Sequence, residues 1–389
     1  MRCTALLGGL AAAVLLHSAA TAQVGANCPP GQTEVRPGSC QAPQVPAPSI
    51  LDYRPRSSLV NDDRPVPRPK FPVIDFHGHP PGMDGSAAGL AALGQQMDAI
   101  GLRVMIVAGN VRGERLRQIV AGIAASPTMK DRVRVFTGID FSNVGPGWAE
   151  NAVRQLEADV AAGAVGIGEI GKNFGQSIRK ADGSRLRADD PDLDPVWQAA
   201  ARLRIPVFIH TADPQEFYRE FDYTNERWLE LALFRSRRHQ EGVRFEELMA
   251  ERDRMFAKHP KTTFIAAHMA YHANDLGRLG RLLDRLPNVY VEVAAILAEL
   301  GRQPRTAHDF FVKYQDRVLF GKDSFQPDEY PYYWRTMETA DEYFDYYRDY
   351  HAFWKLYGMA LPDPVLKKVY YGNALKLVKG LPAGGFPPI

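Results

Sequence analysis

The stretch from Val73 to Pro80, VIDFHGHP, begins with an apolar pair and ends in two histidines that are separated by one glycine. Residues i and i+2 of a strand point to the same face of a sheet. In a strand, His77 and His79 would therefore point into the same space at its C-terminal end. Neutral imidazole is the commonest protein ligand for zinc-like ions, so this stretch predicts a strand that carries two metal ligands.

Seven further short apolar runs follow along the chain, separated by longer amphipathic stretches. Nearly continuous apolar runs are typical of parallel strands buried on both faces, and their alternation with helical stretches indicates βα units. Eight strands, each followed by a helix, predict a (β/α)8 TIM barrel. A doubly wound open sheet is the alternative, but it normally uses fewer strands. The predicted strands are Val73–His77, Arg103–Val107, Val133–Ile139, Val165–Ile170, Pro206–His210, Thr263–His268, Val289–Val293 and Val318–Gly321.

Polar residues stand at the ends of three more of these runs. His210 closes the fifth run, His268 closes the sixth, and Asp323 follows the eighth. A buried imidazole must be hydrogen-bonded or bound to a metal, and the carboxyl ends of barrel strands share the face where active sites lie. We therefore expect one divalent ion to be held by His77, His79, His210 and Asp323, with His268 beside it.

Glu169 closes the fourth run, in GIGEIG, and its role is open. It can point into the barrel and bridge a second metal ion. It can also serve as a hydrogen-bond partner of a ligand histidine, or form a salt bridge with Lys172. The expected cofactor is therefore one divalent ion, with two as the alternative. Zn2+ is the first choice, although sites of His and Asp also accept Mn, Fe or Co.

These residues, together with several longer motifs, resemble the amidohydrolase superfamily. Within it the chain is similar to the amidohydrolase-related (amidohydrolase 2) branch, which also contains the aminocarboxymuconate-semialdehyde decarboxylase-like enzymes. The resemblance runs from about Phe71 to Val378 and includes FIHTADP, NERW, HPKTTFIAAH, LPNVYVEVA, ELGRQPR, FGKDSF and VYYGNALKLV. Lys322 departs from the Thr expected before the last ligand. Glu169 stands where related sequences often carry Lys, and it resembles the TatD-like nucleases, which use two metals.

The resemblance implies a mechanism. The metal lowers the pKa of a bound water toward about 7, Asp323 takes its proton and passes it to the leaving group, and His268 polarises the substrate. Arg302 is implied to meet a substrate carboxylate, and an ion pair with Glu299 is the alternative. The expected reaction is hydrolysis of an amide, ester or lactone bond in a small molecule. The alternatives are a metal-dependent decarboxylase of an aromatic or unsaturated acid and a non-catalytic exported binding protein.

Three connections after predicted strands are long. They follow the fourth run, the fifth run (Thr211–Lys261) and the eighth run, and the last is dense in Tyr, Phe and Trp. Long connections on this face of a barrel commonly form lids and substrate walls. The aromatic segment can equally be a packed surface or a contact in a homo-oligomer, and the two roles are compatible.

The composition restricts the partners. Lys and Arg number 47 and Asp and Glu number 45, a formal net charge of +2, and no basic stripe is visible. We therefore expect a small-molecule substrate and neither nucleic acid nor an anionic membrane surface as a partner. The hydrophobic fraction of 45% is enough for a large core.

The N-terminal region predicts export. Residues 1–22 combine Arg2, the apolar run Ala5–Leu16 and a small-x-small cleavage site, as a signal peptide does. The run is shorter than the about 20 residues of a membrane span, although an uncleaved anchor is the alternative. We expect a periplasmic or secreted protein without a span after cleavage.

Four segments are expected along the chain. A Pro-rich arm at residues 23–70 separates the signal peptide from a barrel at residues 71–380, and residues 381–389 form a C-terminal tail. Cys28 and Cys40 bracket a loop rich in Pro and Gly in the arm. In an exported protein this arrangement suggests a disulfide, and two free thiols are the alternative.

Overall fold

The computed structural model describes residues 28–60, 64–350 and 353–389. The predicted signal peptide, residues 1–22, lies outside the described residues. The chain divides into two compact units, Met1–Ser58 and Leu59–Ile389. Among the described residues, none of the helices is both long enough and apolar enough to cross a bilayer.

The described part of the first unit contains a short antiparallel hairpin. Strands β1 (Thr33–Arg36) and β2 (Ser39–Gln41) pair through Glu34 and Cys40. Gly38 takes the left-handed φ of +77° that the tight turn between them needs. The structure joins Cys28 to Cys40 by a disulfide, which ties this hairpin to the preceding chain.

The second unit begins earlier than the arm boundary expected from the sequence. It starts at Leu59, so the described residues 64–70 of the expected arm belong to it. The backbone N–H of Lys70 donates to Glu338 at 2.9 Å, and the Lys70 ammonium lies 2.6 Å from Asp363. Val66 and Phe71 pack against the hydrophobic core. The last part of the Pro-rich segment is therefore a surface covering of the barrel.

Within residues 64–350, eight parallel strands occur where the eight apolar runs predicted them. They form two hydrogen-bonded runs, β3-β4-β5 and β6-β7-β8-β9-β10, with the two-residue β11 (Asp323–Ser324) added beside β3. The eight strands are β3 (Val73–His79), β4 (Leu102–Val107), β5 (Val133–Val135), β6 (Ile167–Ile170), β7 (Val207–Ile209), β8 (Phe264–Ala266), β9 (Val289–Glu292) and β10 (Val318–Leu319).

Backbone hydrogen bonds join the two runs at both edges. Between β5 and β6, Val165 N donates to Val135 O at 3.0 Å, and Thr137 pairs with Ile167 in a parallel bridge. Between β10 and β3, Phe76 N donates to Phe320 O at 3.0 Å. Each strand therefore has a neighbour on both sides, and the predicted (β/α)8 barrel is confirmed.

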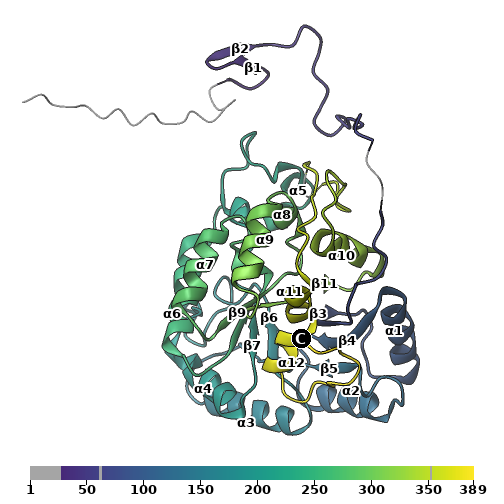
Figure 1. The fold of residues 1–389 in the computed structure, drawn as a ribbon. Helices are drawn as coiled ribbons and strands as arrows, with labels where there is room; N and C mark the ends of the chain where they lie inside the picture. Colours follow the sequence, from purple (N-terminus) through teal and green to yellow (C-terminus); the bar gives the residue numbers. More distant parts are fainter. Residues whose placement is uncertain (1–27, 61–63, 351–352) are drawn as a thin grey trace, which may run out of the picture. The chain divides into compact units, whose positions relative to one another are not determined.

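The helices lie outside the strands (Figure 1). Glycine ends α1, where Gly101 takes a φ of +76° and its N–H meets the last helical carbonyls. The helices that follow the strands are α1 (Ala87–Ile100), α2 (Gly113–Ala125), α3 (Trp148–Ala161), α4 (Asp194–Leu203), α6 (Phe245–Lys258), α7 (Leu276–Arg285), α9 (Pro304–Lys313), α11 (Asp363–Lys367) and α12 (Asn373–Leu377). Two more lie in long connections, α5 (Trp228–Leu233) and α10 (Tyr330–Glu338), and α8 (Leu297–Gly301) lies between β9 and α9.

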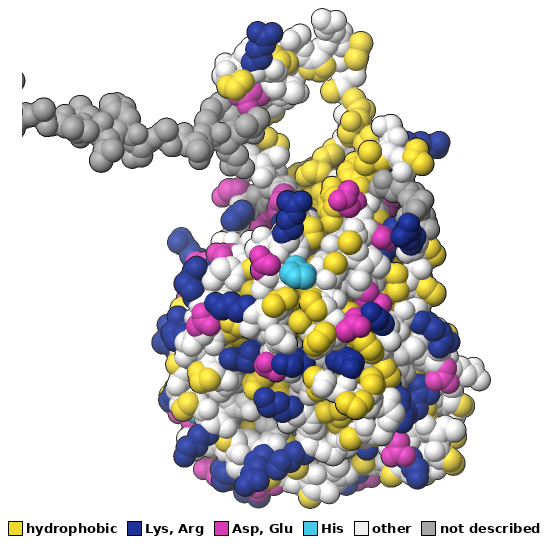
Figure 2. Space-filling view, viewed as in Figure 1, with side chains coloured by type: hydrophobic (Ala, Val, Ile, Leu, Met, Phe, Trp, Pro, Cys, Tyr) yellow, Lys and Arg dark blue, Asp and Glu magenta, His cyan; other side chains and the backbone are white. Residues whose placement is uncertain are grey.

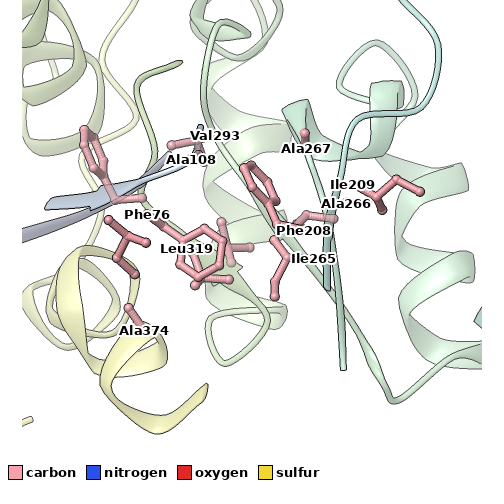
Figure 3. Close-up of a cluster of buried hydrophobic side chains, with 14 of the residues drawn as sticks. Phe76, Ala108, Phe208, Ile209, Ile265, Ala266, Ala267, Val293, Leu319 and Ala374 are labelled. Atoms are coloured by element: carbon pink, nitrogen blue, oxygen red, sulfur yellow. The ribbon is translucent and has the colours of Figure 1, made fainter. Parts of the chain in front are cut away.

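Aromatic rings fill the barrel beneath the polar rim. Phe76 meets Phe136 and Phe208 edge to face, with ring centroids 5.2 Å apart in both pairs. The three residues lie on or directly after alternate strands β3, β5 and β7, the source of a single interior layer in such barrels. Figure 3 shows Phe76, Phe208 and Ile265 within this buried cluster. The Phe208 ring lies 4.6 Å from that of His77, so the core directly supports the first candidate ligand.

The surface carries mixed charge. On the face drawn in Figure 2, cationic and anionic side chains are interspersed between apolar ones. Opposite charges that are interspersed in this way largely cancel one another's electric field.

Candidate metal centre

The end of β3 and the segment after β10 bring one set of donor atoms together. The Nε2 atoms of His77 and His79 lie 3.1 Å apart, and Asp323 Oδ1 lies 4.0 and 3.9 Å from them. Tetrahedral ligands 2.0–2.1 Å from a zinc ion lie about 3.4 Å from each other. The spacing and the nitrogen and oxygen chemistry of this set therefore fit a divalent cation.

Glu169, at the end of β6, faces this set with one oxygen and a second set with the other. Its Oε2 lies 3.3 Å from His77 Nε2 and 3.1 Å from His79 Nε2. Its Oε1 lies 2.7 Å from His210 Nδ1 and 3.9 Å from His268 Nε2. The structure thus brings together His77, Glu169 and His268 as a further group able to hold a cation.

Carbonyl and carboxylate acceptors lie against the outer nitrogens of three histidines. His77 Nδ1 lies 3.2 Å from Glu292 Oε1, His268 Nδ1 lies 2.8 Å from Ala294 O, and His210 Nε2 lies 2.9 Å from Ala212 O. When each outer N–H donates to its acceptor, the lone pair of the other nitrogen points toward Glu169 and the neighbouring donors. This is the tautomer that a metal-binding imidazole needs.

The charges of the site are coupled. Burial would lower the pKa of His77, but the carboxylates of Glu169 and Glu292 raise it well above its usual range. Burial would raise the pKa of Glu169, but His77 and His210 hold it well below its usual range. Burial would also raise the pKa of Asp323, but the charges of His77 and His268 outweigh this effect and lower it. Both carboxylates are therefore ionised near neutral pH.

Glu292, at the end of β9, is a fully buried part of the site that the sequence interpretation missed. Besides His77, it accepts hydrogen bonds from the backbone N–H groups of His268 (2.7 Å) and Ala294 (2.6 Å). Burial would raise its pKa, but His77 and His268 shift the pKa of Glu292 below its usual value. One signal was present: Glu292 is the next-to-last residue of the seventh apolar run, close to the strand-end position of the predicted ligands.

We expect Glu292→Gln to weaken cation binding by about 10- to 100-fold, the usual cost of changing the partner of a ligand histidine. The amide keeps the shape but removes the charge that orients His77. Competition with a chromophoric chelator measures the Zn2+ affinity. Glu251→Gln is the matched control, because Glu251 is a buried carboxylate on α6 that binds Arg185. Equal Zn2+ affinity in the two variants would show that Glu292 does not support the site.

Asp75, also missed from the sequence, joins the two segments that carry the first donor set. Its buried carboxylate accepts from the backbone N–H groups of His77 (2.9 Å) and Lys322 (3.2 Å) and from the Tyr330 hydroxyl (2.6 Å). Lys322, the departure from the family pattern, is buried, and its ammonium binds Glu329 Oε2 at 2.5 Å and Ser324 O at 2.9 Å. These bonds fix the backbone on both sides of Asp323.

A left-handed turn after β8 presents two side chains to the same space. His268, Met269, Ala270 and Tyr271 have φ values of +57°, +52°, +55° and +53°. Such residues cost roughly 1–2 kcal/mol each, so tertiary bonds must hold the turn. Glu292 accepts a hydrogen bond from the backbone N–H of His268, the first residue of the turn, and the buried Arg252 donates to Ala270 O at 2.8 Å.

A cavity of about 190 Å3 opens beside these donors. His210, His268, Tyr271 and Asp323 line its inner end. Tyr271 is the third residue of the site that the sequence did not reveal, and its hydroxyl oxygen lies 2.8 Å from His210 Nε2.

The structure places Arg302 apart from this cavity, whose lining does not include it. Its guanidinium binds both oxygens of Glu226, at 2.9 and 2.8 Å, and lies 4.0 Å over the Trp354 ring. The alternative partner, Glu299, is bound by Arg227 at 2.6 Å instead. Among the described residues, Lys172 likewise pairs with Asp213, at 3.2 Å, and not with Glu169.

Imidazole and carboxylate donors at the carboxyl ends of a closed parallel barrel define the class of metal-dependent (β/α)8-barrel enzymes. A family model described as amidohydrolase matches residues 74–380, and the chain belongs to this family. The predicted membership is thereby confirmed, the chain is an enzyme, and the alternative of a non-catalytic binding protein has no support. A search of curated proteins finds no match.

Several solved structures are similar at low identity. An uncharacterised TIM-barrel protein from Bordetella bronchiseptica has 16% identity and a TM-score of 0.48, covering 78% of this chain and 97% of that one. The 5-carboxyvanillate decarboxylase of Sphingomonas paucimobilis has 16% identity and a TM-score of 0.46, with 79% and 98% covered. The 4-oxalomesaconate hydratase of Rhodopseudomonas palustris has 12% identity and a TM-score of 0.45, with 78% and 95% covered. Sequence identities and TM-scores this low give no information on the reaction that this chain catalyses.

Proposed function

We propose that this enzyme is a metal-dependent hydrolase of an amide, ester or lactone bond in a small molecule, and that it uses two divalent cations. The observation that carries the proposal is the position of Glu169, whose two oxygens face two separate sets of donors. A carboxylate in this position can bridge two cations. The first set is His77, His79 and Asp323. The second is His210 and His268, which lie 2.7 and 3.9 Å from Glu169 Oε1.

The donors suit Zn2+, which binds imidazole nitrogen and carboxylate oxygen, although Mn, Fe and Co accept the same ligands. A cation bound here would lower the pKa of a water molecule toward about 7 and polarise a carbonyl oxygen. An enzyme that activates water in this way is suited to hydrolysis. Decarboxylation does not consume water, so a bridging Glu169 favours hydrolysis.

Two side chains of the cavity supply proton transfer and hydrogen bonding. Asp323 is ionised and lines the cavity, so it can accept the proton of the attacking water and return it to the leaving group. The His210 Nε2–H lies within reach of both Ala212 O and the Tyr271 oxygen. When the two oxygens share this N–H, the hydroxyl proton of Tyr271 is left for a substrate oxygen. His268 lines the same cavity and can orient the substrate carbonyl.

A metal-dependent decarboxylase of an aromatic or unsaturated acid is the second candidate. The observation in its favour is the set of arginines in the cavity lining, Arg227, Arg237 and Arg348, because such substrates are anionic. In that reaction a protonated Asp323 would deliver its proton to the carbon that loses CO2.

Export to the periplasm or the medium is part of the proposal. It is supported by the sequence of residues 1–22 and by the Cys28–Cys40 disulfide, since disulfides persist in oxidising compartments. The intact mass of the protein from a periplasmic fraction tests it. A mass that still includes residues 1–22 would contradict cleavage.

Metal removal and reloading test the function. We expect the chelator-treated protein to lose hydrolysis of a panel of esters, lactones and amides, and to regain it as Zn2+ or Mn2+ is added up to two equivalents. The variant His77→Ala/His79→Ala should keep its circular dichroism and bind less metal. Release of CO2 from aromatic acids without any hydrolysis would establish the second candidate. A protein that binds no divalent cation would exclude both.

A further inference from the structure

The charged side chains that line the cavity are mostly neutralised by one another. Lys172 pairs with Asp213 at 3.2 Å. Arg227 pairs with Glu230 and Glu299, both at 2.6 Å, and Arg237 also binds Glu230. These cations already have anionic partners, so a ligand carboxylate would have to compete with a buried ion pair.

Arg348 differs from these cations. It lies in the aromatic segment after β10 and lines the same cavity as His268 and Asp323. In the described part of the chain its ion-pair partner is Glu329, and the contact of 3.6 Å exceeds a hydrogen bond. The same Glu329 oxygen, Oε2, already binds the Lys322 ammonium at 2.5 Å. Two cations therefore share one carboxylate, and the cavity wall has an excess positive charge at Arg348.

This excess charge is also partly removed from water. The Arg348 side chain is 23% exposed, and its guanidinium lies 5.2 Å from the centroid of the Tyr347 ring. A cation in such surroundings gains from an anion that replaces the lost solvent. The planar guanidinium offers two parallel N–H donors, which match the two oxygens of a carboxylate.

We propose that Arg348 binds a carboxylate of the substrate, and hence that the substrate of the proposed hydrolase is a small carboxylic acid. This inference rests on the proposed function, because it places the scissile bond beside Asp323 and His268 and the acid group at Arg348, all of which line the same cavity. It assigns to Arg348 the part that the sequence resemblance implied for Arg302, which Glu226 already occupies.

Binding of a matched pair of probes tests the site without turnover. We expect the Zn2+-loaded protein to bind benzoate at least about tenfold more tightly than the neutral benzamide in titration calorimetry, as a charge-assisted pair predicts. Arg348→Gln should remove that preference, leave benzamide binding within about twofold, and keep the zinc content and melting temperature. Arg348→Lys should restore part of it. Arg302→Gln is the control and should retain the full preference.

Two results would overturn the proposal. If Arg348→Gln retains the preference for benzoate, the metal centre alone binds the carboxylate. If Arg302→Gln loses it instead, Arg302 is the acid-binding residue. Turnover separates this inference from the proposed function: γ-butyrolactone and its 5-carboxylate derivative are compared as substrates. Hydrolysis of neither, with the benzoate preference intact and dependent on Arg348, would contradict hydrolysis of lactones and support the acid site.

Discussion

Asp323→Asn is expected to lower kcat by about a thousandfold while the protein remains folded, since a positioned acid or base contributes 10²- to 10⁴-fold. The amide nearly matches the carboxylate in size, and the surrounding backbone is held by Asp75 and by the buried Lys322. The asparagine amide, however, cannot accept the proton of the attacking water or pass that proton to the leaving group. KM should change far less than kcat, because the variant removes an interaction made in the transition state.

Steady-state kinetics on the zinc-loaded protein measure this effect, and circular dichroism checks the fold. The metal content must be determined in parallel, because Asp323 also belongs to the first donor set. Asp328→Asn is the matched control, since Asp328 lies exposed in the same connection. A wild-type kcat in Asp323→Asn would exclude catalysis by this carboxylate, whatever the fold.

Glu169→Gln is expected to reduce the bound cation from two equivalents to one and to abolish most hydrolysis. A glutamine offers a single acceptor oxygen, and its amide group carries protons toward the other set of donors. One of the two sets, His77 with His79 and Asp323 or His210 with His268, then loses the Glu169 oxygen that faces it. The loss of affinity for the second cation should exceed the about 10- to 100-fold expected of Glu292→Gln, because the proposal makes Glu169 itself a ligand.

Elemental analysis of the dialysed protein measures the stoichiometry. Glu169→Asp is the informative companion, because it keeps the charge but shortens the reach, and it should retain more of the second cation than Glu169→Gln. If the wild type and Glu169→Gln both hold one equivalent with similar affinity, Glu169 is a hydrogen-bond partner of the histidines. That result would remove the main support for hydrolysis over decarboxylation.

The barrel could be predicted because its signal is local. Each strand is a short apolar run followed by an amphipathic stretch, and every one of the eight runs overlaps an observed strand. The position of His77, His79, His210 and Asp323 at strand ends was equally visible. Parallel strands in a closed barrel share one carboxyl edge, so residues far apart in sequence could be assigned to a common rim before their distances were known.

The residues that support the rim could not be predicted in the same way. Asp75 and Tyr330 are 255 residues apart, and their bond depends on how α10 packs after β10. Glu292 holds His77 because β9 and β3 flank the short β10 on either side. Tyr271 reaches the cavity through a left-handed turn of non-glycine residues, which propensity alone would never suggest.

The sequence by itself determined the order of strands and helices, the family, and the types of residue at the strand ends, because these depend on periodicity and on position within each βα unit. Only the tertiary structure decided the pairing of charges. Arg302 and Arg348 look alike in sequence, yet one meets Glu226 with both nitrogens and the other shares Glu329 with Lys322. Electrostatic interactions depend on distance and burial, and both of these follow from how the long connections pack over the barrel.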